Sequence, residues 1–190
     1  MSSRIGITNW SPWRTARVVT SLIVVMVASY YLVVGFDNIT NPTNPNGSNW
    51  PFVTGVLSGD GVPADSGFGW RFIDAEWFAS VSYIAIIATE MLTGIVLLVG
   101  GVKGLRSSAR RHSWDRVQRW TFAGGFLGLL LYFFGFIVVG GNWFIMYLNS
   151  RYDGLDPAFQ NSVVAFAMII FTALVMIGGR FEDHSPSVIP

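Results

Sequence analysis

The sequence predicts an all-α membrane protein, a four-transmembrane-helix bundle with a partly ordered external loop between the first and second helices. Of its 190 residues, 52% are hydrophobic and only 12% are charged, whereas soluble domains average about 25% charged residues. Four apolar stretches approach or exceed the ~20 residues that cross a bilayer. The basic residues lie mostly outside these stretches, on one predicted side of the membrane.

The first span is expected at residues 18–36, after an N-terminal segment at residues 1–17. The rival interpretation is a signal peptide. This apolar run is longer than the usual signal core of ~7–15 residues, and no small-residue cleavage site follows it. An external loop is expected at residues 37–76, where Asn, Pro and Gly predict turns. Aromatic residues later in the loop predict a folded cap with one short helix near residues 51–57.

The second span is expected at residues 77–102, which give a helix of about 39 Å that crosses the bilayer with some tilt. A basic connector at residues 103–119 leads to the third span at residues 120–141. An external interfacial segment at residues 142–156 then precedes the fourth span at residues 157–179. These four spans place both termini on the same side of the membrane.

Charge placement predicts which side that is. Of the 12 basic residues, all except Arg71 and Arg151 lie near the termini or in the connector. By the positive-inside rule, both termini, including the tail at residues 180–190, are cytoplasmic together with the connector. The start of the fourth span agrees with a helix N-terminus, because Asp156 can act as N-cap and Pro157 suits the first helical position.

Glu90 is the unusual residue of the second span, because a carboxylate deep in the membrane costs about 2.5–3.5 kcal/mol and must face protein or water. Helical spacing places Glu90, Gly94 and Gly101 on one stripe. Thr93 flanks that stripe, and the glycines permit close backbone approach. The set predicts an intramembrane packing site in which Glu90 is an interhelical hydrogen-bonding residue. The alternative is a proton or cation site.

Glycines predict two further sites. The first is a helix-contact face in the third span, formed by Gly124, Gly128 and Gly135. Small residues at such spacing favour close helix contact, either within the bundle or with a partner. The second is an external interfacial corner, formed by Gly140, Gly141, Asn142 and Trp143. A structural corner is the favoured interpretation of this stretch, and a ligand pocket is the alternative.

The chain lacks the residues that several kinds of chemistry require. The chain has no cysteine, which excludes disulfides and thiolate chemistry. Neither His112 nor His184 lies in a predicted span, and hydrolase and phosphate-loop motifs are missing. We therefore expect no catalytic residue, metal or cofactor, and a protein that is not an enzyme. A formal net charge of +1 also argues against nucleic acid as a partner.

Five stretches carry a resemblance to a known family: residues 36–40, 69–73, 86–93, 134–141 and 142–147. They resemble a bacterial family of predicted small integral membrane proteins, a domain of unknown function. In that family an acid commonly follows the double glycine, where this chain has Asn142, and a Trp-Asn-Gly stretch stands where this chain has residues 152–154. The resemblance implies four membrane helices and no established activity.

The leading functional hypothesis is a non-catalytic accessory subunit of a larger bacterial inner-membrane complex, a transporter or a respiratory assembly. Such a subunit acts by helix packing and contacts membrane lipids and other integral membrane subunits. One alternative is a small proton- or ion-coupled transporter or channel that uses Glu90. Another is a lipid- or quinone-binding membrane module with an aromatic groove near Trp143 and Phe144.

Overall fold

The computed structural model describes residues 12–43, 49–107 and 111–182. Residues 1–11 of the N-terminal segment and residues 183–190 of the tail, among them His184, lie outside the described residues, and so do the expectations that concern them. Within the described part, every regular element is a helix and no strand occurs. Four helices are long and apolar enough to cross a membrane. The predicted all-α bundle of four membrane helices is confirmed.

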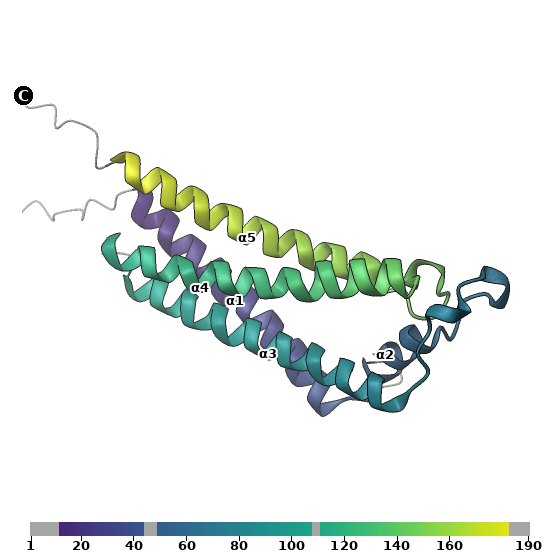
Figure 1. Cartoon of the computed structure of the whole chain (residues 1–190). Helices are drawn as coiled ribbons and strands as arrows, with labels where there is room; N and C mark the ends of the chain where they lie inside the picture. The colour runs from purple at the N-terminus through teal and green to yellow at the C-terminus, as the bar shows by residue number, and fades with distance from the viewer. Residues whose placement is uncertain (1–11, 44–48, 108–110, 183–190) are drawn as a thin grey trace, which may run out of the picture.

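The four long helices run side by side along one axis (Figure 1). They are longer than the apolar stretches in the sequence, because their polar ends continue the helix. The bounds are α1 Pro12–Thr40, α3 Glu76–Ser107, α4 Arg111–Leu129 with its π-helical continuation η3 Leu130–Trp143, and α5 Leu155–Glu182. The π-helical stretch is notable, because π-helix occurs mostly as single turns and often at functional sites.

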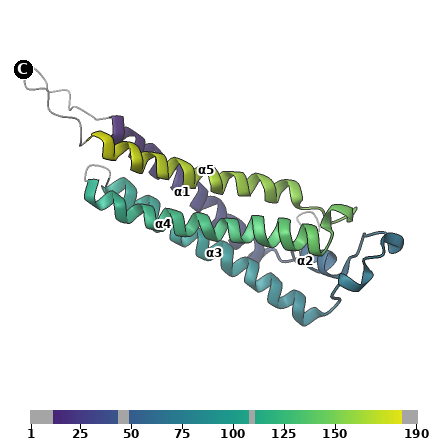
Figure 2. The same cartoon turned by 45° about the horizontal axis from the view of Figure 1, so that its top comes forward.

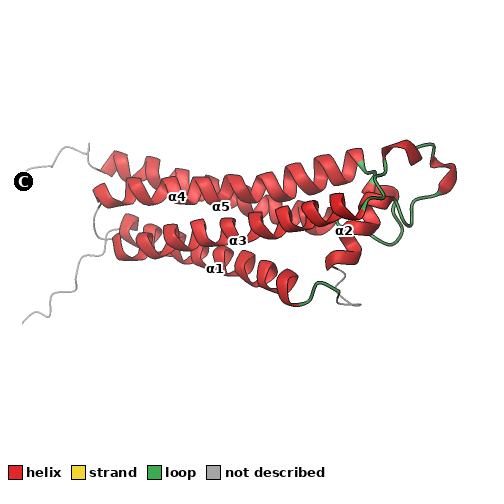
Figure 3. Cartoon of the chain, turned by 60° about the horizontal axis from the view of Figure 1, so that its bottom comes forward, coloured by secondary structure: helices red, strands yellow, loops and turns green. Residues whose placement is uncertain are grey.

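In Figure 3, α1 lies beside α3 and α4 beside α5, and in Figure 2, α3 lies beside α4 and α1 beside α5, so each long helix contacts two neighbours around the bundle. The contact between α1 and α3 is the most extensive in the fold. It depends on small residues: a Cβ at Gly94 would lie 2.7 Å from the Leu32 side chain, and a Cβ at Gly101 would lie 2.6 Å from that of Val25. These two helices are antiparallel and their backbones lie close together.

The loop between α1 and α3 folds as a cap on one end of the bundle. It contains α2, Asn49–Ser58, which confirms the short helix expected near residues 51–57. Two single turns follow, η1 Ala64–Ser66 and η2 Gly69–Arg71. Val53, Val56 and Leu57 of α2 are buried and pack with residues of α3 and of the segment after η3. We call this end of the molecule the α2 end.

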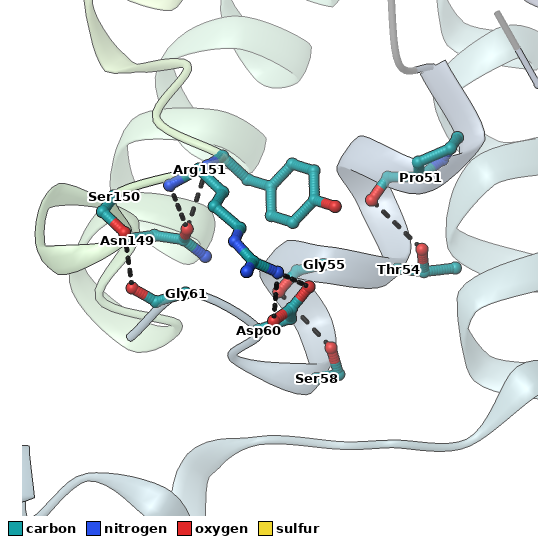
Figure 4. Close-up of polar contacts among 10 residues, drawn as sticks. Pro51, Thr54, Gly55, Ser58, Asp60, Gly61, Asn149, Ser150 and Arg151 are labelled. Atoms are coloured by element: carbon teal, nitrogen blue, oxygen red, sulfur yellow. Dashed lines mark hydrogen bonds and ion pairs between the residues drawn. The ribbon is translucent and has the colours of Figure 1, made fainter. Parts of the chain in front are cut away.

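A second loop, which joins η3 to α5, is tied to the cap. Arg151 places Nη1 3.1 Å from both carboxylate oxygens of Asp60. The Ser150 amide and hydroxyl both donate to the carbonyl oxygen of Gly61, at 3.1 and 3.2 Å (Figure 4). Gly61 has φ +97°, and a Cβ there would lie 2.6 Å from Oδ1 of Asn149. Both its backbone conformation and its surroundings therefore favour glycine.

The segment after η3 differs from the sequence expectation of a purely interfacial stretch. Phe144, Ile145 and Met146 are buried, with 5%, 1% and 1% of their surfaces exposed. The chain turns inward here because Ile145 adopts the left-handed conformation, φ 48°, which is rare for a β-branched residue. A short turn, η4 Met146–Leu148, follows.

The start of α5 also differs from the expected one. The helix begins at Leu155, and its amide is capped by Oδ1 of Asp153 at 3.0 Å. Asp156 therefore lies inside the first turn and is not the N-cap. Pro157 is tolerated two positions into the helix because the amides of the first turn need no intrahelical partner.

Basic residues gather at the end of the bundle opposite the α2 end, and we call it the basic end. Here α1 begins and α5 ends, with the Trp13 ring packed against Gly178. The ammonium group of Lys103 lies 4.6 Å from the centre of the Trp120 ring. Other basic side chains on the described helices at this end are Arg14, Arg17, Arg106 and Arg119.

Candidate functional site: two cavities beside Glu90

Glu90 is buried against α1 and bonded to it. Asn38 Nδ2 donates a hydrogen bond of 2.7 Å to Oε2 of Glu90, and the two residues are 8% and 2% exposed. Tyr83, two turns before Glu90 on α3, donates from its hydroxyl to the backbone carbonyl of Asn38 at 2.6 Å. The carboxylate therefore faces protein, as its position in an apolar helix requires.

The neighbouring helix makes room for this contact. A Cβ at Gly35 would lie 3.3 Å from Cβ of Glu90 and 2.8 Å from the Met91 sulfur. Glu90 is therefore level with Gly35, which precedes the last residue of α1, Thr40, by about 8 Å of helical rise. The carboxylate therefore lies near the end of α1 but near the middle of α3, because α3 extends past α1 to pack with α2.

A cavity of about 310 Å³ opens beside Glu90, and we call it the polar cavity. Residues from all four spans, from α2 and from the loop before α5 form its wall. The polar residues in that wall are Tyr30, Asn38, Asn49, Tyr83, Glu90, Tyr132, Asp153 and Asn161. Asn161 of α5 donates to the hydroxyl of Tyr30 on α1 at 3.0 Å, which links the two helices along one side of the cavity.

A second cavity of about 190 Å³ lies between α2, α3 and η3, and we call it the apolar cavity. Apart from Ser82, its wall carries only apolar side chains and glycine. The two cavities share Phe52, Val53, Ile86 and Phe136 as wall residues. The rings of Phe52 and Phe136 are stacked, with centres 6.2 Å apart and planes inclined by 22°. These two aromatic and two aliphatic side chains therefore form the boundary between the two cavities.

The expected packing residues of α3 all face α1 or the bundle interior. Gly94 and Gly101 form the close contact with α1 described above. Thr93 is fully buried, and its hydroxyl has no hydrogen-bond partner among the described residues. None of these three residues lines either cavity, so of this set only Glu90 belongs to the cavity wall.

The three glycines of the expected helix-contact face have different surroundings in the structure. A Cβ at Gly124 would lie 2.5 Å from the Leu97 side chain of α3, and Gly128 is covered by Tyr31 of α1. Both positions are therefore occupied within the chain. A Cβ at Gly135, in contrast, would have only the Leu130 carbonyl oxygen within 4 Å, at 3.6 Å. Gly135 leaves space because it lines the apolar cavity.

The residues of the expected external corner, at the end of η3, mainly connect η3 to the cap. Arg71 Nη1 donates to the carbonyl oxygen of Asn142 at 3.1 Å. The Trp143 ring makes an edge contact with Trp70, at 5.9 Å between centres, and Arg71 lies over both rings. Gly140 lines the apolar cavity, whereas a Cβ at Gly141 would lie 2.9 Å from the Leu155 side chain.

Sequence reasoning missed several residues of the site. Asn38 was assigned to the loop, because it begins a run of turn-forming residues. The signal present in the sequence was spacing: Asn38 follows Ala28, Tyr31 and Gly35 at helical intervals, and in the structure these residues form one buried stripe of α1. Tyr132 and Phe136 resembled ordinary apolar span residues, and nothing in the sequence distinguished them.

Four membrane-length helices around a buried carboxylate define an integral, multi-pass membrane protein. The model of a family described as "Predicted small integral membrane protein (DUF2165)" matches residues 16–175, and the chain belongs to this family. No curated protein matches the chain, and no solved structure matches it.

Proposed function

We propose that this protein binds an amphiphilic membrane molecule and performs no chemistry on it. The polar end of that molecule occupies the polar cavity beside Glu90, and its hydrocarbon part occupies the apolar cavity. One observation carries the proposal: a cavity with eight polar residues in its wall and an almost wholly apolar cavity share Phe52 and Phe136 as wall residues. The proposal requires that side chains of this shared wall move aside so that the two cavities join into one amphipathic space.

The dimensions and composition of the cavities support this proposal. Ligand pockets are typically ~300–1,000 Å³, mostly apolar, with a few polar groups that fix orientation. The polar cavity, at about 310 Å³, reaches that range by itself. The proposal keeps the earlier idea of a lipid- or quinone-binding module but moves its site inward. Phe144 lines the apolar cavity, and Trp143 does not.

Charge supports an orientation. We propose that the basic end faces the cytoplasm of a bacterium, with the chain in its inner membrane, because basic residues are retained on the cytoplasmic side. In this orientation the cap with α2 lies on the external side, and the polar cavity lies in the outer half of the bilayer.

The other two hypotheses stay predictions. An accessory subunit needs a contact face, and Gly124 and Gly128 do not offer one because α3 and α1 cover them. Copurification of other membrane subunits in a fixed ratio would support that role. A transporter that uses Glu90 predicts pH- or ion-dependent flux in proteoliposomes, which a Glu90→Gln change should abolish.

The proposed binding is tested by mass spectrometry of the molecules that copurify with the protein after gentle extraction. Gly135→Leu should fill the apolar cavity, where space is open, and should remove the retained amphiphile while the helical content stays unchanged. The matched control is Gly69→Leu, since Gly69 also has no atom close to its Cβ position but lies in the cap. Retention of the same molecules by both variants would contradict the proposal.

A further inference from the structure

We propose that the polar cavity selects an amphiphile whose polar end is a protonated amine. This inference rests on the proposed function and specifies the chemical class of its ligand. Its basis has two parts: Asn38, Asn49 and Tyr83 direct donors at acceptors within the protein while several acceptor oxygens stay open, and the charged side chains that line the cavity are two acids with no base.

Three donor groups of the cavity wall are bonded to acceptors within the protein. Asn38 Nδ2 donates to the Glu90 carboxylate, and the Tyr83 hydroxyl donates to the Asn38 carbonyl. Asn49 Nδ2 donates to Oδ2 of Asp37 at 3.2 Å and to the carbonyl oxygen of Asn41 at 3.3 Å. These orientations are fixed by chemistry, because carbonyl oxygens and carboxylates only accept.

The acceptors of the same residues are open. Within the described part of the chain, Oε1 of Glu90 and the side-chain oxygens of Asn38 and Asn49 accept no hydrogen bond from the protein. Oε1 of Glu90 is not among the enclosed side-chain atoms that lack a partner, and Glu90 lines the polar cavity, so we take Oε1 to face that cavity. A ligand that satisfies these oxygens must bring donors, and an ammonium group brings three.

Charge selects the ammonium over other polar groups. Glu90 and Asp153 line the polar cavity, and no Lys, Arg or His of the described chain joins them. The nearby Arg151 is directed to Asp60 instead. A phosphate or carboxylate head would face these acids without a cation to neutralise it, which is costly at a buried site. A hydroxyl head offers a single donor and no charge.

The test uses the intact protein in nanodiscs of phosphatidylcholine, with empty nanodiscs subtracted. Equilibrium binding is measured for decylamine, decanol, decanoate and propylamine, which separate the head from the chain. Decylamine should bind at least about tenfold more tightly than decanol or decanoate, as expected for hydrogen bonds to a charged group. Glu90→Gln should remove most of this preference. Thr89→Val is the matched control, because the Thr89 hydroxyl bonds only to its own helix, at Ala85.

Each outcome decides a different point. Equal binding of decylamine and decanoate would overturn the amine selectivity and leave the proposed function standing. No saturable binding of any decyl compound would overturn the proposed function. Propylamine bound as tightly as decylamine would contradict the role of the apolar cavity and support the amine site. Should Glu90→Gln fail to fold, Asp153→Asn keeps the capping ability at α5 and should lower the preference for the amine.

Discussion

Asn38 of α1 and Glu90 of α3 are joined by a buried hydrogen bond of 2.7 Å, across the most extensive helix contact of the fold. This bond compensates a carboxylate in an apolar helix, and the same two side chains line the polar cavity. The same contact therefore serves both the stability of the bundle and the geometry of the proposed binding site.

Loss of the Asn38 amide should destabilise the bundle. In the Asn38→Leu variant Glu90 loses its hydrogen-bond donor, and we expect a cost of about 1.5–3 kcal/mol, typical of a bond to a charged group. Thermal unfolding in detergent, followed by circular dichroism, measures it. Asn41→Leu is the control, because Asn41 bonds to Asp37 in an exposed position. Equal losses of stability in the two variants would show that the buried hydrogen bond contributes no more than the exposed one.

The close contact between α1 and α3 should not tolerate an added methyl group at position 94. Gly94→Ala places its Cβ 2.7 Å from Leu32 and 3.1 Å from the Ala28 carbonyl oxygen, so we expect a loss of about 1–3 kcal/mol from overpacking. Gly135→Ala should instead be neutral or stabilise by up to about 1 kcal/mol, because alanine is a better helix former and the space is open. A comparison of the two unfolding midpoints tests the assignment, and the reverse order would refute it.

In the cap, the backbone conformation of Gly61 should contribute more to stability than the exposed ion pair between Asp60 and Arg151. Gly61→Ala introduces a side chain at φ +97° beside Asn149, and we expect a cost of about 1–3 kcal/mol. Asp60→Ala removes the exposed pair with Arg151 and should cost less than about 1 kcal/mol. Limited proteolysis of the cap reports both effects. Faster cleavage of the Asp60 variant than of the Gly61 variant would be the contrary result.

The proposed orientation can be tested with single cysteines, since the chain has none of its own. Cysteines at Asp65 in the cap and at Ser107 at the basic end should react differently with a membrane-impermeant maleimide. In intact cells or right-side-out vesicles we expect labelling at position 65 only, and labelling at position 107 after permeabilisation. The opposite pattern would place the basic end outside.

Much of the architecture follows from local sequence properties. Hydropathy locates four spans because each one must be apolar over its own length, and the helical stripe through Glu90 and Gly94 correctly places that face of α3 against protein. The cap helix was also accessible, because aromatic residues cluster around it. Helix ends were less accessible: α1 continues to Thr40 through residues that favour turns in isolation.

The cavities could not be derived in the same way. Their walls combine residues from the four spans, from α2 and from the segment between η3 and α5, so they depend on how the spans cross and on where α2 packs. The inward turn at Ile145 is another example, because its backbone conformation contradicts the preference of a β-branched residue. The polar character of the site was visible only as Glu90, since its partner Asn38 belongs to a different span.

The most direct measurement is photo-crosslinking from the boundary between the two cavities. A diazirine-bearing phenylalanine analogue at Phe136 faces both cavities, whereas the same analogue at Phe133, 44% exposed on the same helix, faces the surroundings of the bundle. After irradiation in cell membranes, mass spectrometry should find one discrete adduct at position 136, lost in Gly135→Leu, and a mixture of bulk lipids at position 133. If position 136 gives no adduct, or the same lipid mixture as position 133, the cavities do not hold a selected amphiphile.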